Sequence, residues 1–135
     1  MFGKSSSSKP QNRIDSLVGA GTTIHGDIVF SGGLRVDGEI RGNVSGVADQ
    51  PSTLVISEQA RVEGEISVTH LVANGAAVGS IRATELLELQ SRARVTGDVE
   101  YSTIEIQLGA VVQGRLVHKP PHAKAVELKL AASNE

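Results

Sequence analysis

Apolar residues return every six positions along much of this chain and alternate with polar residues over shorter stretches. Two early runs keep this step of six, Val18, Ile24, Phe30 and Val36 in one and Ile28, Leu34 and Ile40 in the other. A helix would instead place its apolar residues three and four positions apart. Local alternation, as in Ile104-Glu105-Ile106, predicts short strands with one buried face.

A six-residue phrase with a central glycine recurs along the chain. Its clearest copies are Arg35–Ile40, Arg61–Ile66 and Arg94–Val99, and weaker copies stand at 23–28, 76–81 and 111–116. The residue two before each glycine is apolar: Ile24, Val36, Val62, Ala77, Val95 and Val112. The last four of these follow one another at nearly constant intervals. Internal repetition of this kind predicts a structure built by stacking one unit on the next.

The repeat predicts an all-β fold, a single-domain parallel β-helix. Three short strands of about six residues would complete one coil, and coils would stack at the ordinary strand spacing of roughly 4.8 Å. Residues 15–118 have room for about six coils, a rod roughly 30 Å long. The repeat glycines are expected at corners, where glycine adopts a positive φ without a Cβ clash; close core packing is the alternative. They are Gly26, Gly38, Gly64, Gly79, Gly97 and Gly114.

Three segments fall outside this pattern. Residues 1–14 are polar and are expected to be flexible. Residues 119–135 begin with Lys119-Pro120-Pro121, which ends the strand pattern, and are expected to be disordered or transiently helical. Residues 45–53 make the interval from Gly38 to Gly64 the longest between repeat glycines, which predicts a loop bulging from one corner.

Composition excludes several classes of function. The net charge of −2 gives no strong field for nucleic acid. The lack of cysteine excludes disulfides, thiolate zinc sites and cysteine catalysis. No apolar run is long enough to cross a bilayer as a helix, and no secretory signal is visible. We therefore expect a cytoplasmic protein with no membrane-spanning helix.

Acidic residues offer the first candidate chemistry, because they follow a repeat glycine at Asp27, Glu39, Glu65 and Asp98. Stacked in a column, they could bind a cation or supply a general acid and base. Ser80 and Arg115 interrupt the column. We therefore favour a solvated outer face over a catalytic one.

Histidines offer the second candidate chemistry, since hexapeptide-repeat enzymes use histidine to bind zinc or activate a hydroxyl. His25 and His70 stand in different units, and His118 and His122 flank the Pro-Pro pair. No Ser–His–Asp arrangement, phosphate loop or dinucleotide fingerprint is evident. We predict no enzyme, no catalytic residue, no metal and no cofactor.

The first residues, Met1-Phe2-Gly3-Lys4, combine two large apolar side chains with a cation. Burial of Met1 and Phe2 in lipid would contribute ~2 kcal/mol each, and Lys4 near anionic lipid up to ~1 kcal/mol. If the chain forms a polymer, many copies of this segment would bind one membrane together, and their high effective concentration would make the binding firm. Met1, Phe2 and Lys4 are thus predicted to bind a membrane; the alternative is an ordinary chain start.

Both ends of a β-helix expose unpaired backbone groups and a slice of apolar core. Exposed edges recruit further strands unless they are covered, and repeat proteins normally need capping units. The polar flanking segments make poor caps, so we predict end-to-end stacking into a filament without nucleotide. The predicted contact residues are Leu108, Val112 and Leu116 in the last unit, and Val18 and Ile24 in the first.

The tandem phrases Ala60–Ile66 and Ala93–Val99, together with Ile24–Ile28 and Leu34–Val44, resemble the bactofilins over residues 15–118. The resemblance implies a right-handed β-helix that polymerises into non-polar filaments. It also implies that Met-Phe-x-Lys, matched by Met1–Lys4, binds the inner face of the cytoplasmic membrane, and that the polymer recruits cell-wall enzymes and helps to set cell shape. Some bactofilins use a phenylalanine of the C-terminal coil in polymer contacts, and this chain has none there.

We therefore expect a cytoskeletal scaffold of the bactofilin type, whose partners are further copies of itself, the membrane and cell-wall proteins. One alternative is a short hexapeptide-repeat enzyme such as an acyltransferase, which would need longer runs of step six and a histidine facing a subunit cleft. Another is a β-helix adaptor that binds a cytoskeletal protein without polymerising.

Overall fold

The computed structural model describes residues 14–120, which form fifteen short strands and no helix. The strands are β1 (Ser16–Val18), β2 (Thr23–His25), β3 (Ile28–Phe30), β4 (Gly32–Val36), β5 (Glu39–Arg41), β6 (Val44–Gly46), β7 (Ser52–Ile56), β8 (Arg61–Glu63), β9 (Ile66–Ala73), β10 (Ala76–Val78), β11 (Ile81–Leu89), β12 (Arg94–Thr96), β13 (Val99–Ile106), β14 (Val111–Gln113) and β15 (Leu116–His118).

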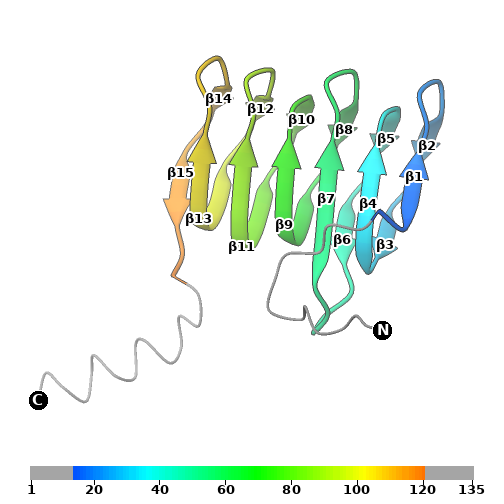
Figure 1. The fold of residues 1–135 in the computed structure, drawn as a ribbon, viewed down its shortest axis with the longest axis horizontal. Helices are drawn as coiled ribbons and strands as arrows, with labels where there is room; N and C mark the ends of the chain where they lie inside the picture. The colour runs from blue at the N-terminus through cyan, green and yellow to red at the C-terminus, as the bar shows by residue number, and fades with distance from the viewer. Residues whose placement is uncertain (1–13, 121–135) are drawn as a thin grey trace, which may run out of the picture.

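The strands wind into a solenoid of about six coils with three faces (Figure 1). The first face contains β1, β4, β7 and the C-terminal parts of β9, β11 and β13. The middle face contains β2, β5, β8, β10, β12 and β14. The third face contains β3, β6, the N-terminal parts of β9, β11 and β13, and β15. Every pairing is parallel, so the predicted parallel β-helix is confirmed.

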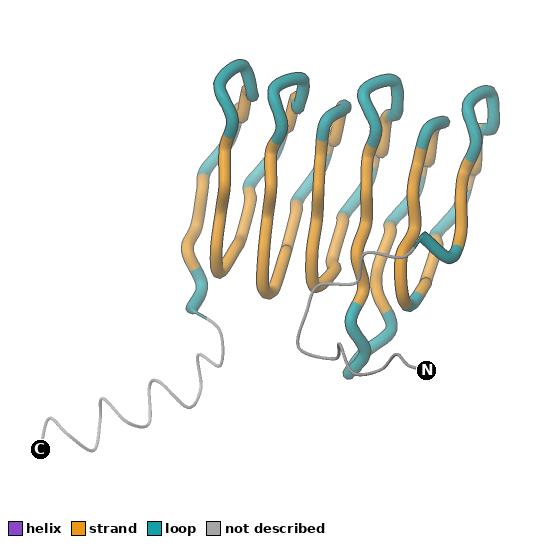
Figure 2. Tube along the Cα trace, in the orientation of Figure 1, coloured by secondary structure: helices purple, strands orange, loops and turns teal. Residues whose placement is uncertain are grey.

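The winding is right-handed. In Figure 1 the near strands β4, β7 and β9 point upward, and the chain crosses to the far side at the top before it returns downward. Figure 2 shows the same path as it advances toward the C-terminal end. Right-handed crossover is the usual outcome when twisted parallel strands are joined.

The core is a stack of aliphatic columns, in which each side chain lies on its equivalent in the next coil. One column contains Leu34, Leu54, Leu71 and Leu87, and its members are at most 3% exposed. The middle face supplies a second, of Ile40, Val62, Ala77 and Val95. Each large side chain buried in this way contributes ~1.5–3 kcal/mol, which explains why the fold needs few aromatic residues.

The turns between the first and middle faces have two lengths. Four residues, 19–22, 57–60, 90–93 and 107–110, make the turn in four coils, whereas two residues, 37–38 and 74–75, suffice in the other two. The tall and low turns are visible along the upper edge of Figure 2. Arg92 Nη1 lies 2.8 Å from Glu58 Oε2, so an ion pair crosses over the short turn at 74–75.

The short turn at residues 37–38 corrects the predicted repeat. Ile40, not Val36, pairs with Ile24 and Val62 in the middle face. Val36 instead lies between Val18 and Ile56 in the first face. The phrase Arg35–Ile40 is therefore out of register with Arg61–Ile66, and the prediction that it is an equivalent unit is wrong.

The corner glycine of the second coil is consequently Gly42, not Gly38. Five other predicted glycines do occupy the corner between the middle and third faces, with φ from +133° to +154°: Gly26, Gly64, Gly79, Gly97 and Gly114. Gly38 is required for a different reason, because a Cβ there would lie 2.3 Å from the carbonyl oxygen of Thr22. Gly38 also lies at a corner, in the turn between β4 and β5, but it is not equivalent to the other five and does not share their positive φ.

The predicted loop at 45–53 is shorter than expected. Residues 45–46 complete β6 and residues 52–53 begin β7, which leaves 47–51 as the connection. It projects from the lower edge of the solenoid in Figure 1. Asp49 adopts a left-handed φ of +66° within it, a conformation that aspartate tolerates better than most residues.

Candidate functional site: the two ends and the polar corners

The C-terminal coil consists of the last part of β13 with β14 and β15, and it is the last coil within residues 14–120. Ile106 continues the column of Leu89, yet Ile106 is 49% exposed while Leu89 is fully buried. Leu116 continues the column of Val99 in the same way and is 43% exposed. This end therefore presents open strand edges around a slice of the apolar core.

Leu108 differs from the other predicted contact residues because it does not belong to the core. It lies in the turn 107–110 and is 96% exposed, whereas the equivalent positions in inner coils are Glu58 and Ser91. Val112 is partly buried against the core. Ile106 and Val111 add exposed apolar surface at this end that we did not assign to the contact. Ile106 could have been found, because it stands one repeat after Leu89 in the same column.

The N-terminal coil, β1 to β3, offers less core surface to a partner. Val18 is buried and Ile24 is partly buried against the core. The exposed apolar residues of this coil, Leu17 and Val29, neighbour inward residues in their strands and so point outward from the solenoid rather than along its axis. The two ends are thus chemically different.

Polar residues that follow the corner glycines form a ladder of hydrogen bonds. Asp27 Oδ1 accepts from the Asn43 amide at 2.9 Å, and Asn43 Oδ1 accepts from the Glu65 amide at 3.0 Å. Asp98 Oδ1 accepts from the Arg115 amide at 3.1 Å, and this bond, with the Arg115 side chain, lowers the pKa of Asp98. Each bond satisfies a backbone donor of the next coil.

This ladder corrects the predicted acidic column. The column contains Asp27, Asn43, Glu65, Ser80, Asp98 and Arg115, and Glu39 is not a member. Glu39 lies on the middle face, where Glu39 Oε2 accepts from Arg41 Nε at 2.8 Å. Within residues 14–120, no three histidine or acidic side chains are grouped so that they could hold a metal ion. The side chains of Asp27, Asn43 and Asp98 in this column accept hydrogen bonds from backbone amides.

The histidines described by the structure lie apart. His25 is exposed on β2, and the His118 ring lies 5.7 Å from that of Tyr101. His70 is buried on β9, with its Nε2 atom 3.4 Å from Glu85 Oε1, and burial lowers the pKa of His70. His122 lies outside the described residues.

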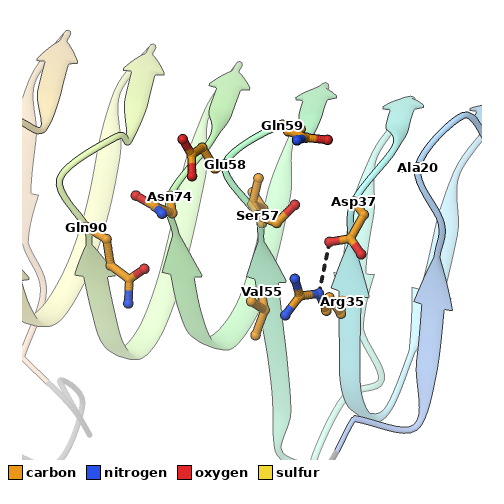
Figure 3. A pocket seen from close by; sticks show the side chains of 10 residues that line it. Ala20, Arg35, Asp37, Val55, Ser57, Glu58, Gln59, Asn74 and Gln90 are labelled. Atoms are coloured by element: carbon orange, nitrogen blue, oxygen red, sulfur yellow. Dashed lines mark hydrogen bonds and ion pairs between the residues drawn. The ribbon is translucent and has the colours of Figure 1, made fainter.

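A shallow polar groove of about 410 Å³ crosses the outer side of the first face (Figure 3). Its lining includes Asp37, Ser57, Asn74 and Gln90, which stand where successive strands of this face end. The Ser57 hydroxyl and then Arg35, whose Nε donates to Asp37 Oδ1 at 2.9 Å, lower the pKa of Asp37. The groove thus holds an Asp37 carboxylate that is engaged by Ser57 and Arg35, next to the side-chain amides of Asn74 and Gln90.

Met1, Phe2 and Lys4 lie outside the described residues. Within 14–120 the structure contains no helix with the length and apolar character needed to cross a bilayer.

The comparison with known families agrees with this architecture. Residues 16–117 match the family described as bactofilin, polymer-forming cytoskeletal. The chain belongs to the bactofilin family. The resemblance deduced from the repeat phrases is thereby confirmed, and the family description is that of cytoskeletal proteins.

Two curated bactofilins of Myxococcus xanthus (strain DK1622) are similar to this chain. Bactofilin BacP is 32% identical over 97 residues, which cover 70% of this chain and 40% of BacP. Bactofilin BacO is 28% identical over 103 residues, which cover 70% of this chain and 82% of BacO. The match thus spans less than half of BacP. No solved structure matches the chain significantly.

Proposed function

We propose that this bactofilin is a cytoskeletal scaffold that stacks end to end into non-polar filaments without a nucleotide. The supporting observation is the C-terminal coil, where the columns of Leu89 and Val99 end in the exposed residues Ile106 and Leu116. Another coil placed on this end would bury both residues and pair the free edges of β14 and β15. The family description, polymer-forming, supports the same assembly.

The filament is proposed to lie on the inner face of the cytoplasmic membrane and to localise cell-wall proteins. Met1 and Phe2 would insert into the lipid while Lys4 contacts anionic headgroups. Each contact is weak alone, but a filament carries many copies at high effective concentration. This part of the proposal rests on the sequence of residues 1–4 and on family membership.

Electron microscopy of the purified full-length chain, in buffer with a chelator and no nucleotide, tests assembly. We expect filaments at micromolar concentrations, and added nucleotide should change neither their amount nor their length. A monodisperse monomer at tens of micromolar, by light scattering and sizing, would contradict the proposal.

A further inference from the structure

The outer side of the first face carries a patch of uncharged and apolar side chains, which we call the first-face patch: Thr53, Val55, His70, Val72 and Leu86. The strand register places His70 between Thr53 and Leu86, and Val72 beside Val55. Their strand neighbours Leu54, Leu71 and Leu87 are fully buried in the core. Since side chains alternate along a strand, the patch residues point away from the core. Figure 3 shows Val55 on this outer side of β7, near Arg35.

Two residues of the first-face patch are buried although they point away from the core. Thr53 is 5% exposed and His70 is 7% exposed. Thr53 Oγ1 and His70 Nδ1 are also buried, and among residues 14–120 neither atom has a hydrogen-bond partner. A buried polar atom normally has a partner, because leaving it unpaired is costly. Two polar atoms of the patch thus lack a partner, and its accessible apolar part consists of the partly buried Val55, Val72 and Leu86.

The chain enters the solenoid beside this patch. The Asp15 amide donates to the Gly33 carbonyl at 2.9 Å, and Asp15 Oδ2 accepts from the Gly33 amide at 3.0 Å. Gly33 is in register with Thr53, so Asp15 extends the row that leads to His70. Residues 1–13 join the fold at this edge. Thirteen extended residues reach about 43 Å, and four coil spacings cover only about 19 Å.

The charges of the two partners are complementary. Residues 1–13 contain Lys4, Lys9 and Arg13 and no acidic residue. The first-face patch is bordered toward the C-terminal end by Glu85, Glu88 and Glu105. Glu85 lies against His70, and Glu88 Oε2 accepts from Gln90 Nε2 at 3.0 Å, which leaves carboxylate oxygens for further donors. Toward the N-terminal end, Arg35 is already paired with Asp37.

We propose that residues 1–13 fold back and dock on the first-face patch of their own chain. Met1 and Phe2 would cover Val55, Val72 and Leu86, while the basic residues face the glutamates. This rests on the proposed function, because the docked residues include the proposed membrane contact. A segment docked on the patch cannot insert into lipid, so docking lowers the apparent membrane affinity by the fraction of chains that are docked. Docking of residues 1–13 would thus partly inhibit membrane binding by the filament.

Disulfide trapping in the full-length chain tests the docking, and the absence of native cysteine makes it clean. We would combine Gly3→Cys with Val72→Cys, and as a control combine Gly3→Cys with Thr96→Cys on the exposed outer side of β12. Under mild oxidation the first pair should close at least tenfold faster than the control pair. Equal rates would overturn the proposal.

A second experiment separates docking within one chain from docking between chains. Chains that carry one cysteine each, mixed in equal amounts, should cross-link slowly. If they cross-link as fast as the double variant, the occupant of the patch is a neighbouring subunit's segment and the fold-back is wrong.

Vesicle binding tests the consequence. Val72→Asn removes apolar surface from the patch without adding a charge, so it should release the segment and raise binding to phosphatidylglycerol vesicles at least threefold relative to Thr96→Asn, the same polar residue on the exposed side of β12. Equal binding by the two variants would refute the competition. Trapping without vesicle binding by any variant would leave the docking and remove the proposed membrane function. If the chain binds vesicles but the two cysteine pairs close at equal rates, the proposed membrane function stands and the docking is refuted.

Discussion

The Cα of Gly64 faces the carbonyl oxygen of Gly42 so closely that a Cβ on Gly64 would lie 2.1 Å from that oxygen. The same approach recurs from coil to coil, since a Cβ on Gly79 would lie 2.3 Å from the Gly64 oxygen. A backbone oxygen cannot move aside as a flexible side chain can. At Gly64, Gly79, Gly97 and Gly114 this corner is therefore closed to any side chain, in addition to its positive φ.

Gly64→Ala should accordingly destabilise the fold. The φ of +146° at this position costs a residue with a Cβ ~1–3 kcal/mol, and relief of the contact with Gly42 adds to that cost. We expect the thermal midpoint, followed by circular dichroism, to fall by at least about 5 °C. Gly19→Ala is the control, because a Cβ there meets nothing within 4 Å. Similar midpoints for both variants would show that the corner can relax.

The sequence predicted the fold because its two periods, alternation along a strand and the return of glycine with an aliphatic neighbour, are direct consequences of the coil. It misplaced the second coil because two overlapping phrases, Val36-Asp37-Gly38 and Ile40-Arg41-Gly42, fit the same pattern. Spacing could have decided between them. Val36 divides the interval from Ile24 to Val62 very unevenly, whereas Ile40 lies closer to its middle. The misplacement also put Glu39 into the acidic ladder.

The surfaces at the ends of the solenoid were harder to predict from sequence than the packing of its inner coils. Leu116 and Ile106 could be recognised from sequence, because they continue core columns at the last repeat. The exposure of Leu108 depends on the four-residue turn 107–110, and turn length varies between coils without changing the strand pattern. The ion pair from Arg92 to Glu58 depends on the same variation, since it bridges a short turn. The first-face patch required the register of β7, β9 and β11, which no local pattern contains.

Leu116→Arg should dissolve the filament while leaving the fold intact. An unpaired charge buried at a subunit contact costs about 3 kcal/mol or more, which corresponds to at least about a 100-fold higher critical concentration. In the monomer the same side chain lies at an open end, where water solvates it. Sedimentation should show monomers, and circular dichroism should stay β-rich.

Leu108→Arg tests whether the turn 107–110 contributes to the subunit contact separately from the exposed core residues of the same end. Leu108 is solvent-exposed in the monomer, so its replacement should not change the thermal midpoint, yet it should reduce the pelleted fraction if the turn touches the next subunit. Ser91→Arg, at the equivalent turn position one coil earlier, is the control and should assemble normally. Filaments from both Leu108→Arg and Leu116→Arg would exclude the C-terminal coil as the contact.

Acidification should loosen the last coil through Asp98. The Arg115 amide and side chain hold the pKa of Asp98 below its ordinary value of 3.8. A carboxyl with a lowered pKa stabilises the fold above the unfolded value, and that contribution is lost as pH falls through the folded pKa. Hydrogen exchange at the Arg115 amide should therefore become less protected below about pH 3.8. Asp98→Asn should keep the bond, as Asn43 does for Glu65, and lose this pH dependence. Identical pH profiles would exclude Asp98 as the titrating group.

Deleting Met1–Lys4 should release the filament from anionic vesicles without stopping assembly. The proposed subunit contacts lie at the two ends of the solenoid, and the first strand of the solenoid begins only at Ser16. Phe2→Ser should weaken binding in the same direction by removing apolar burial. Raising the salt concentration should screen Lys4, Lys9 and Arg13 and leave the apolar part of the binding unchanged. Co-sedimentation with vesicles, with electron microscopy of the same samples, measures both properties together. If the deleted and complete chains bind vesicles equally, residues 1–4 are not the membrane contact, and any membrane association must come from another surface of the solenoid.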